Sequence, residues 1–209
     1  GSILLLSFGA LGISAVCRAI LEGKDRQRVE QIFGTFMSKE VEKHLLSDPR
    51  RLELGGTEVQ GTVVFLDIWD SVPRASTRTP QMMVAELNEL FAELVPCVLE
   101  HRGFISRFTG DGFLALFGVP IESDSHAEDA VACCHAIQDA VGKFNIKRPA
   151  DPFIVSCGVN SGAFLCGNIG TPDRSEFTVI GDVVNVATRI ETANRKLNTR
   201  ILVSSASCL

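Results

Sequence analysis

The strongest constraint on the fold is residues 61–69, which read GTVVFLDIW. The run is rich in β-branched and aromatic residues and carries a single charge, Asp67, near its carboxyl end. Such a segment is typical of a strand, and its lack of alternation predicts burial on both faces. A strand of this kind lies inside a sheet. We therefore expect the domain to form around it, with Asp67 at one end.

Helices are predicted on either side of a short hairpin. Residues 79–103 have a capping Thr79, a proline at the first helical position and a terminating Gly103. Residues 123–144 carry a second apolar stripe at helical spacing. Between them, GFISRF and GFLALFG are predicted as strands, because the TGDG segment that joins them has the Asp-Gly signature of a tight turn.

The remainder of the chain adds further strands and a third helix. FIVSCGVNSGAFLCGNIG predicts a strand, a glycine turn and a second strand, and FTVIGDVVNVATRIETANR predicts a short strand, a turn and a helix. TRILVSS predicts a last strand. The order β-α-β-β-α-β with later additions is the ferredoxin-like arrangement, an α+β fold whose antiparallel sheet is covered by two helices on one face.

This arrangement brings two acids together. The first strand is central in it and lies beside the hairpin, so Asp67 is expected close to Asp111 of the TGDG turn. Two carboxylates about 4 Å apart repel by about 4 kcal/mol at an effective dielectric near 20. Shared protonation or divalent cations offset such repulsion. On a nucleotide enzyme, the oxygen ligands favour Mg²⁺ or Mn²⁺, and two metals would activate an attacking oxygen and stabilise a leaving one. The other interpretation of Asp111 is a simple turn former.

Composition excludes some classes of protein. The 209 residues have a formal net charge of −5, which argues against a general nucleic-acid binder but not against a nucleotide site, where metals neutralise phosphate charge. The seven cysteines include no CxxC pair. Most lie in apolar segments, which favours free thiols in a reducing compartment.

The amino-terminal segment has a different character. Residues 3–16 form an uncharged run of 14 residues, shorter than the roughly 20 needed to span a bilayer. Basic residues follow it, as they do at the cytoplasmic end of a transmembrane helix. We expect residues 1–22 to be the end of such a helix and residues 23–51 to be a helical linker that transmits a signal. The alternative is a soluble dimerisation helix.

Four blocks of sequence together resemble one family. VVFLDIWDS, GFISRFTGDGFLALFG, VSCGVNSGAFLCGNIG and EFTVIGDVVNVATRIE are similar to the catalytic domain of class III nucleotidyl cyclases, in that family's order and spacing, over residues 52–209. The preceding segment also resembles the one that joins a membrane or sensor region to bacterial members. The resemblance implies a cytoplasmic catalytic domain, anchored in the membrane in the full-length protein. It also implies conversion of a nucleoside triphosphate to a 3′,5′-cyclic monophosphate and pyrophosphate.

The resemblance also implies roles for individual residues. Asp67 and Asp111 match the two metal-binding aspartates, and Ile68 matches a backbone-carbonyl ligand of two divalent cations, Mg²⁺ or Mn²⁺. Asn185 matches the residue that orients the ribose, and Arg189 matches the one that stabilises charge on the transferred phosphorus. Family members are head-to-tail homodimers with two shared sites, so Asn185 and Arg189 would come from the partner chain.

Two further positions concern the base. Arg107 stands where adenylate cyclases carry a lysine and guanylate cyclases a glutamate. Thr178 fits the adenylate pattern of many bacterial members, whereas guanylate cyclases typically carry a cysteine there. An arginine donates to adenine, although it also forms a fork to the N7 and O6 acceptors of guanine. The glutamate that would accept from guanine is absent. We therefore expect ATP as the substrate.

Other features depart from the family pattern. The loop IWDSVPRAST replaces the usual IRGFT, and it places the bulky Trp69 and the acidic Asp70 beside the expected phosphate site. Arg74 and Arg78 are candidates for restoring positive charge there. Family members also usually continue past this last strand to a hairpin that bears a phosphate-binding lysine.

We expect an adenylate cyclase that acts by a two-metal mechanism at a homodimer interface. The alternatives are a guanylate cyclase and a degenerate cyclase-like domain that regulates or dimerises. A diguanylate cyclase is disfavoured, because TGDGF lacks the paired acids of a GGDEF-like hairpin.

Overall fold

The computed structural model describes Lys43 and residues 54–171 and 174–208, so the expected membrane segment and nearly all of the expected linker lie outside the described residues. Along the chain, the described elements are β1 (Gly55–Ile68), α3 (Ser71–Ser76), α4 (Pro80–Glu100), β2 (Phe104–Phe108), β3 (Phe113–Phe117), α5 (His126–Ile146), β4 (Val155–Thr171), β5 (Arg174–Ile180), α6 (Asp182–Leu197), β6 (Ile201–Val203) and the short 3₁₀ helix η2 (Ser205–Ser207).

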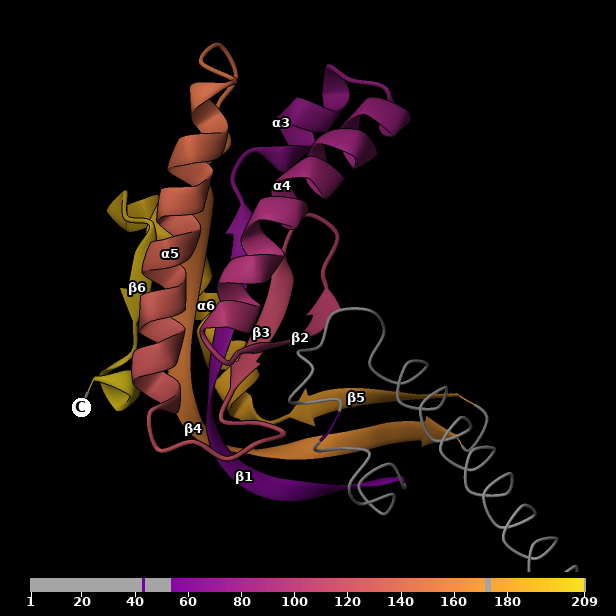
Figure 1. Cartoon of the computed structure of the whole chain (residues 1–209), viewed down its shortest axis with the longest axis vertical. Helices are drawn as coiled ribbons and strands as arrows, with labels where there is room; N and C mark the ends of the chain where they lie inside the picture. Colours follow the sequence, from indigo (N-terminus) through magenta and orange to yellow (C-terminus); the bar gives the residue numbers. More distant parts are fainter. Residues whose placement is uncertain (1–42, 44–53, 172–173, 209) are drawn as a thin grey trace, which may run out of the picture.

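The sheet has the predicted ferredoxin-like core. Its strands lie in the order β2-β3-β1-β4-β5, and β6 pairs with β4 in parallel. The strand β1 pairs antiparallel with both β3 and β4, so it is central as the apolar run predicted. Helices α4 and α5 lie on one side of the sheet (Figure 1). This arrangement confirms the α+β fold.

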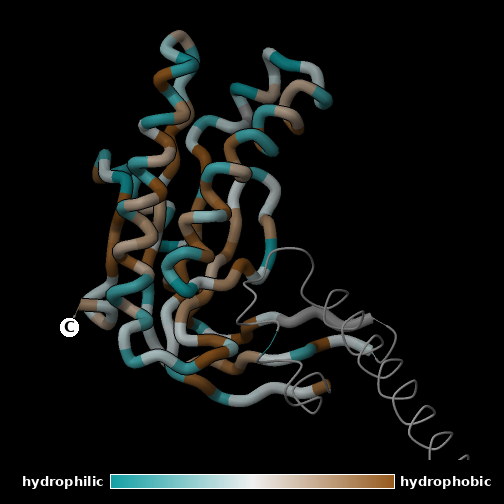
Figure 2. The backbone as a smooth tube through the Cα atoms, viewed as in Figure 1, coloured by the Kyte–Doolittle hydropathy of each residue, from teal (hydrophilic) through white to brown (hydrophobic). Residues whose placement is uncertain are grey.

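Apolar side chains pack on both faces of the central strand. Val64, Leu66 and Ile68 belong to a core with α4 and α5, whereas Val63 belongs to a second core with α6. Hydrophobic stretches accordingly run along the strands and recur along the helices (Figure 2). The two cores explain why the second half of β1 is apolar on both faces, because each face meets a different helical layer.

One element differs from the sequence prediction. A glycine turn between two strands is predicted within residues 153–170, but β4 is a single strand of 17 residues that pairs with β1 over most of its length. The glycines have another purpose. A Cβ on Gly158 would stand 2.3 Å from the carbonyl oxygen of Ala187, so this glycine lets α6 lie directly against the sheet.

The loop after β1 also holds a short helix that the sequence did not predict. Trp69 leaves the strand, and its backbone N–H donates to the carbonyl of Ile154 over 2.8 Å. Asp70 then takes a left-handed conformation with φ of 56°, and α3 follows. This turn sends the chain away from the sheet, so the end of β1 stays open beside the hairpin.

Two further findings concern the described residues alone. Their six cysteines are all free thiols, as expected. In the same part of the chain, none of the helices combines the length and the apolar character that a membrane span requires.

Candidate active site

The two aspartates lie at the same end of the sheet. Leu66 pairs with Phe113, so Asp67 follows on β1 where Asp111 precedes β3. A Cβ on Gly112 would stand 2.0 Å from the carbonyl oxygen of Leu66, which shows how closely the hairpin turn lies against β1. The backbone of the turn therefore fixes Asp111 beside Asp67.

The electrostatics of the pair are those of neighbouring acids. Burial, followed by the charges of Asp111 and Glu191, raises the pKa of Asp67 to about 6, against an opposing effect of Arg195. Asp111 accepts a hydrogen bond from the hydroxyl of Ser71, which lies at the start of α3. The unusual loop thus supplies one polar group that orients the second aspartate.

The backbone carbonyl of Ile68 also faces this site. Its side chain is fully buried in the core, while its oxygen accepts a hydrogen bond of 3.4 Å from Arg195. Two carboxylates and a carbonyl are the oxygen donors that Mg²⁺ and Mn²⁺ prefer. Within the described residues no three His, Cys, Asp or Glu side chains gather as a metal cluster. These donors fit a hard divalent cation whose remaining ligands are water or nucleotide oxygens.

A buried polar chain lies behind the pair. The indole N–H of Trp69 donates to Ser156 over 2.6 Å, and the hydroxyl of Ser156 donates to Glu191 over 2.6 Å. The guanidinium of Arg200 lies 4.1 Å from the centre of the indole ring. Trp69 is therefore packed and hydrogen-bonded within its own chain.

Asn185 and Arg189 lie on a different face of α6. The buried face of this helix consists of Val183, Ala187, Glu191 and Asn194. Asn185 and Arg189 are exposed, and the guanidinium of Arg189 lies 3.6 Å from the carboxylate of Asp182 on the same helix. Both polar residues therefore lie away from the core.

The two base-reading candidates come from strands that contact each other. Arg107 is an exposed residue of β2, and Thr178 is a half-buried residue of β5 that pairs with Gly167. These strands lie at opposite ends of the pairing order, yet they meet because the β4–β5 arm bends back past β2. The fold therefore places Arg107 and Thr178 on neighbouring strands of one chain.

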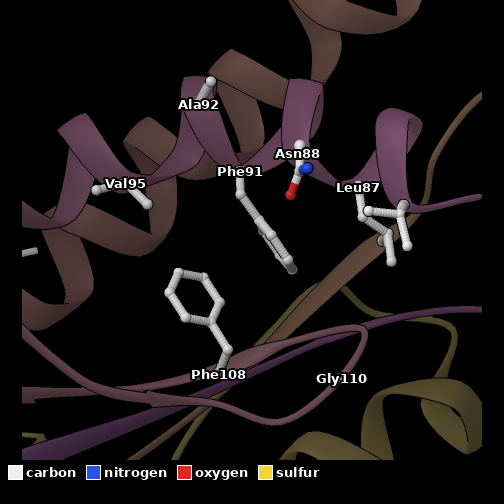
Figure 3. A pocket seen from close by; sticks show the side chains of 8 residues that line it. Leu87, Asn88, Phe91, Ala92, Val95, Phe108 and Gly110 are labelled. Carbon is white, nitrogen blue, oxygen red and sulfur yellow. The ribbon is translucent and has the colours of Figure 1, made fainter. Parts of the chain in front are cut away.

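An apolar groove lies next to the hairpin, apart from the two aspartates. It has a volume of about 430 Å³ between α4 and the turn that contains Gly110. The rings of Phe91 and Phe108 contact each other, with their centres 5.0 Å apart, and line the groove together with Asn88, a polar group at its edge (Figure 3). Exposed apolar side chains, Met82 and Val84, extend this surface along α4.

Arg74 and Arg78 do not lie free at the phosphate site. The guanidinium of Arg74 lies 2.6 Å from Asp151, and that of Arg78 lies 2.8 Å from Glu86. Arg74 also lies over the ring of Phe153, 3.9 Å from its centre. These arginines join α3 and the loop after it to α4 and to the segment before β4, and their charge is paired with acids within the chain.

Sequence reasoning missed two residues of α6, Glu191 and Arg195. Both belong to the site, but nothing in the spacing of RIETANRK shows that they reach the end of β1. The only available signal was their separation of four residues, which places them on one helix face. Contact with β1 depends on how closely α6 approaches the sheet at Gly158.

Comparisons with known proteins agree with this geometry. Residues 57–209 match the family described as the adenylate and guanylate cyclase catalytic domain. Among curated relatives, the chain is 36% identical over 188 residues to an uncharacterized protein of Mycobacterium tuberculosis, covering 89% of this chain and 32% of that protein. It is 34% identical over 148 residues to adenylate cyclase 1 of Rhizobium meliloti, covering 69% of this chain and 22% of that protein. The chain thus spans about a third or less of these relatives.

Solved structures show the same fold. The guanylyl cyclase Cya2 superposes with a TM-score of 0.68 at 31% identity, over 74% of this chain and 79% of that chain. The adenylyl cyclase CyaB from P. aeruginosa superposes with a TM-score of 0.63 at 26% identity, over 74% and 81% of the two chains. The sequence blocks, the fold and these likenesses agree, and the chain belongs to the adenylate and guanylate cyclase catalytic domain family.

Proposed function

We propose that this chain is an adenylate cyclase that converts ATP to 3′,5′-cyclic AMP and pyrophosphate at sites shared by two copies. The observation that carries the proposal is the division of its polar residues between two faces. Asp67, Asp111 and the Ile68 carbonyl lie together at the end of β1, while Asn185 and Arg189 point outward from α6. A single chain that holds both sets apart needs a second chain to complete either site.

The first set would hold two divalent cations. Asp67, Asp111 and the Ile68 carbonyl would be the protein ligands, and phosphate oxygens of the nucleotide would complete the coordination. Bound there, the cations would neutralise phosphate charge and favour the ionised 3′ hydroxyl. The hydroxyl of Ser71 would keep Asp111 oriented.

The second set would act on the nucleotide held by the partner chain. Asn185 would fix the ribose by hydrogen bonds, and so align the 3′ oxygen with the α-phosphorus. Arg189, whose planar fork matches phosphate oxygens, would stabilise the charge that develops during transfer. The ion pair between Arg189 and Asp182 is exposed to solvent and therefore weak, so a phosphate is able to replace Asp182 as the partner of Arg189.

We infer the preference for adenine from Arg107 and Thr178. Their neighbouring strands would present a cationic donor and a hydroxyl to one edge of the purine. Adenine offers ring nitrogens to a donor and an amino group to the hydroxyl oxygen. The similarity to adenylate cyclase 1 of Rhizobium meliloti supports this preference.

A guanylate cyclase is the second candidate. Arg107 is able to form a fork to the N7 and O6 acceptors of guanine, and the solved guanylyl cyclase Cya2 shares 31% identity with the chain. Against it, neither Arg107 nor Thr178 accepts strongly from the N1 and N2 groups of guanine.

The exposed apolar surface of α4 supports association of two copies. Val84 of α4 and Phe108 of β2 line the groove beside the hairpin, and Met82 of α4 is also exposed; apolar surface of this kind is common at protein interfaces. We also propose that residues 1–51 connect the catalytic domain, residues 52–209, to a membrane or sensor region, so that the domain acts at the cytoplasmic side.

Product identification tests the proposed activity. Purified protein is incubated with ATP or GTP and Mn²⁺, and the products are identified by mass spectrometry. We expect cyclic AMP and pyrophosphate, with ATP preferred. Cyclic GMP as the main product would favour the second candidate, and no cyclic nucleotide from either substrate would indicate a regulatory domain.

An Asp111→Ala variant serves as the matched control. It should fold, because Gly110 and Gly112 still close the turn, but it should make no product. Turnover by this variant would contradict the metal assignment.

A further inference from the structure

The guanidinium of Arg195 lies close to three oxygen atoms around the proposed metal site. Its guanidinium lies 3.7 Å from the Asp67 carboxylate, 3.9 Å from the Asp70 carboxylate and 3.4 Å from the Ile68 carbonyl, to which it donates. Two of these atoms are oxygens that we assign to the metals. Arg195 thus places a positive charge beside the proposed metal ligands of its own chain.

A divalent cation and this guanidinium would meet the same oxygens. Like charges this close repel, so cation binding to Asp67 and the Ile68 carbonyl requires Arg195 to withdraw. The Arg195 side chain is able to withdraw because it is 44% exposed. It lies in the last turn of α6, where the helix dipole favours a cation, so the guanidinium stays in a favourable field after it moves. Asp70 is 75% exposed and offers it an alternative partner.

We propose that Arg195 is a built-in cation that occupies the Asp67 and Ile68 oxygens in the metal-free chain and competes with divalent metal for them. The inference rests on the proposed metal site. It also gives the acid in the unusual loop a role: Asp70, already 3.9 Å from Arg195, would keep its pairing with the guanidinium after displacement, so that the acid does not face the phosphates unneutralised.

Mn²⁺ binding in the absence of nucleotide tests the competition. Free Mn²⁺ is measured by electron paramagnetic resonance during titration of the wild type and of Arg195→Gln, Arg195→Lys and Arg200→Gln variants. Arg195→Gln should bind Mn²⁺ about two- to fivefold more tightly, the range that a partly exposed ion pair provides. Arg195→Lys keeps the charge and should stay closer to the wild type.

Arg200→Gln is the matched control, because Arg200 contacts the same Trp69 ring but has no described contact with Asp67. It should bind Mn²⁺ as the wild type does. Equal or weaker binding by a folded Arg195→Gln variant, checked by thermal melting in EDTA, would overturn the competition while leaving the metal site intact. Absence of binding in all four proteins would overturn the metal site and the competition together.

Discussion

At the scale of single residues, Asp67 shows the conflict between stability and function. Burial and the charges of Asp111 and Glu191 raise its pKa to about 6 in the folded chain, so ionisation of the carboxylate costs more free energy there than in the unfolded chain. A carboxyl group whose pKa is raised in this way is typical of functional sites, since its charge does not stabilise the fold. The neighbouring Arg195 offsets only part of the cost.

Removal of this charge should stabilise the metal-free protein. The folded state binds the Asp67 proton more tightly than the unfolded state, so this residue's contribution to stability decreases as the pH rises from about 4 to about 6 and stays low above. Asp67→Asn should therefore raise the free energy of unfolding by about 1–3 kcal/mol at pH 7.5 in EDTA, and by less at pH 5. Denaturant melts at both pH values measure the difference.

Asp70→Asn is the control for this measurement. Its carboxylate is 75% exposed, so the substitution should change stability little at either pH. A lower stability of Asp67→Asn at pH 7.5 would mean that the ion pair with Arg195 outweighs burial, and would contradict our account of Asp67.

The base preference also belongs to the residue scale. Replacing Arg107 by Glu and Thr178 by Cys introduces the pair that the resemblance associates with guanylate cyclases. A glutamate accepts from the N1 and N2 groups of guanine, so the ratio of kcat/KM for GTP over ATP should rise by about tenfold or more. Unchanged preference in an active double variant would mean that these two positions do not contact the base.

At the scale of elements, the site depends on the contact between α6 and β4. Asn194 donates to the Cys157 carbonyl over 3.0 Å, and Gly158 allows the helix backbone to approach the strand. This contact directs Glu191 and Arg195 toward the end of β1 and leaves Arg189 outside. Gly158 therefore permits the close approach of the helix that carries Asn185 and Arg189 and that brings Glu191 and Arg195 to the end of β1.

Gly158→Ala should disturb this contact. The added Cβ would stand 2.3 Å from backbone atoms of α6, so the helix must shift, and overpacking of this kind costs about 1–3 kcal/mol. Gly142→Ala in α5 is the matched control. A Cβ there meets nothing within 4 Å, so alanine should leave stability unchanged or raise it by up to about 1 kcal/mol. Thermal melting of both variants measures the contrast, and equal melting temperatures would contradict it.

The sequence predicts elements better than it predicts their contacts. The apolar run of β1 and the Asp-Gly turn helped to predict the ferredoxin-like core, because a strand and a tight turn are each determined by local sequence patterns. The glycines of β4 were misread as a turn, because a glycine required for close helix packing looks the same as one required for chain reversal. Arg195 was missed for a related reason: its contacts with Asp67 and Asp70 depend on the placement of α6.

At the scale of the whole molecule, one protomer presents two incomplete halves of a site. Asp67 and Asp111 lie at the end of β1, and Asn185 and Arg189 project from α6 toward solvent. Thr178 lies on β5, which leads directly into α6, and Arg107 lies on β2, which contacts β5. The two base-reading candidates therefore lie on the side of the second half. The sequence supplied these residues through its likeness to a family, but their division between two faces is a property of the folded chain.

Complementation between two inactive chains tests this division most directly. Asp67→Ala and Asn185→Ala chains are each expected to be inactive, and a mixture is assayed for cyclic AMP after exchange of subunits. In a two-fold dimer, half of the pairs are mixed and each has one intact site, so activity should recover to about a quarter of the wild-type value. A mixture of folded, exchanging chains that stays inactive would contradict a site shared between two copies.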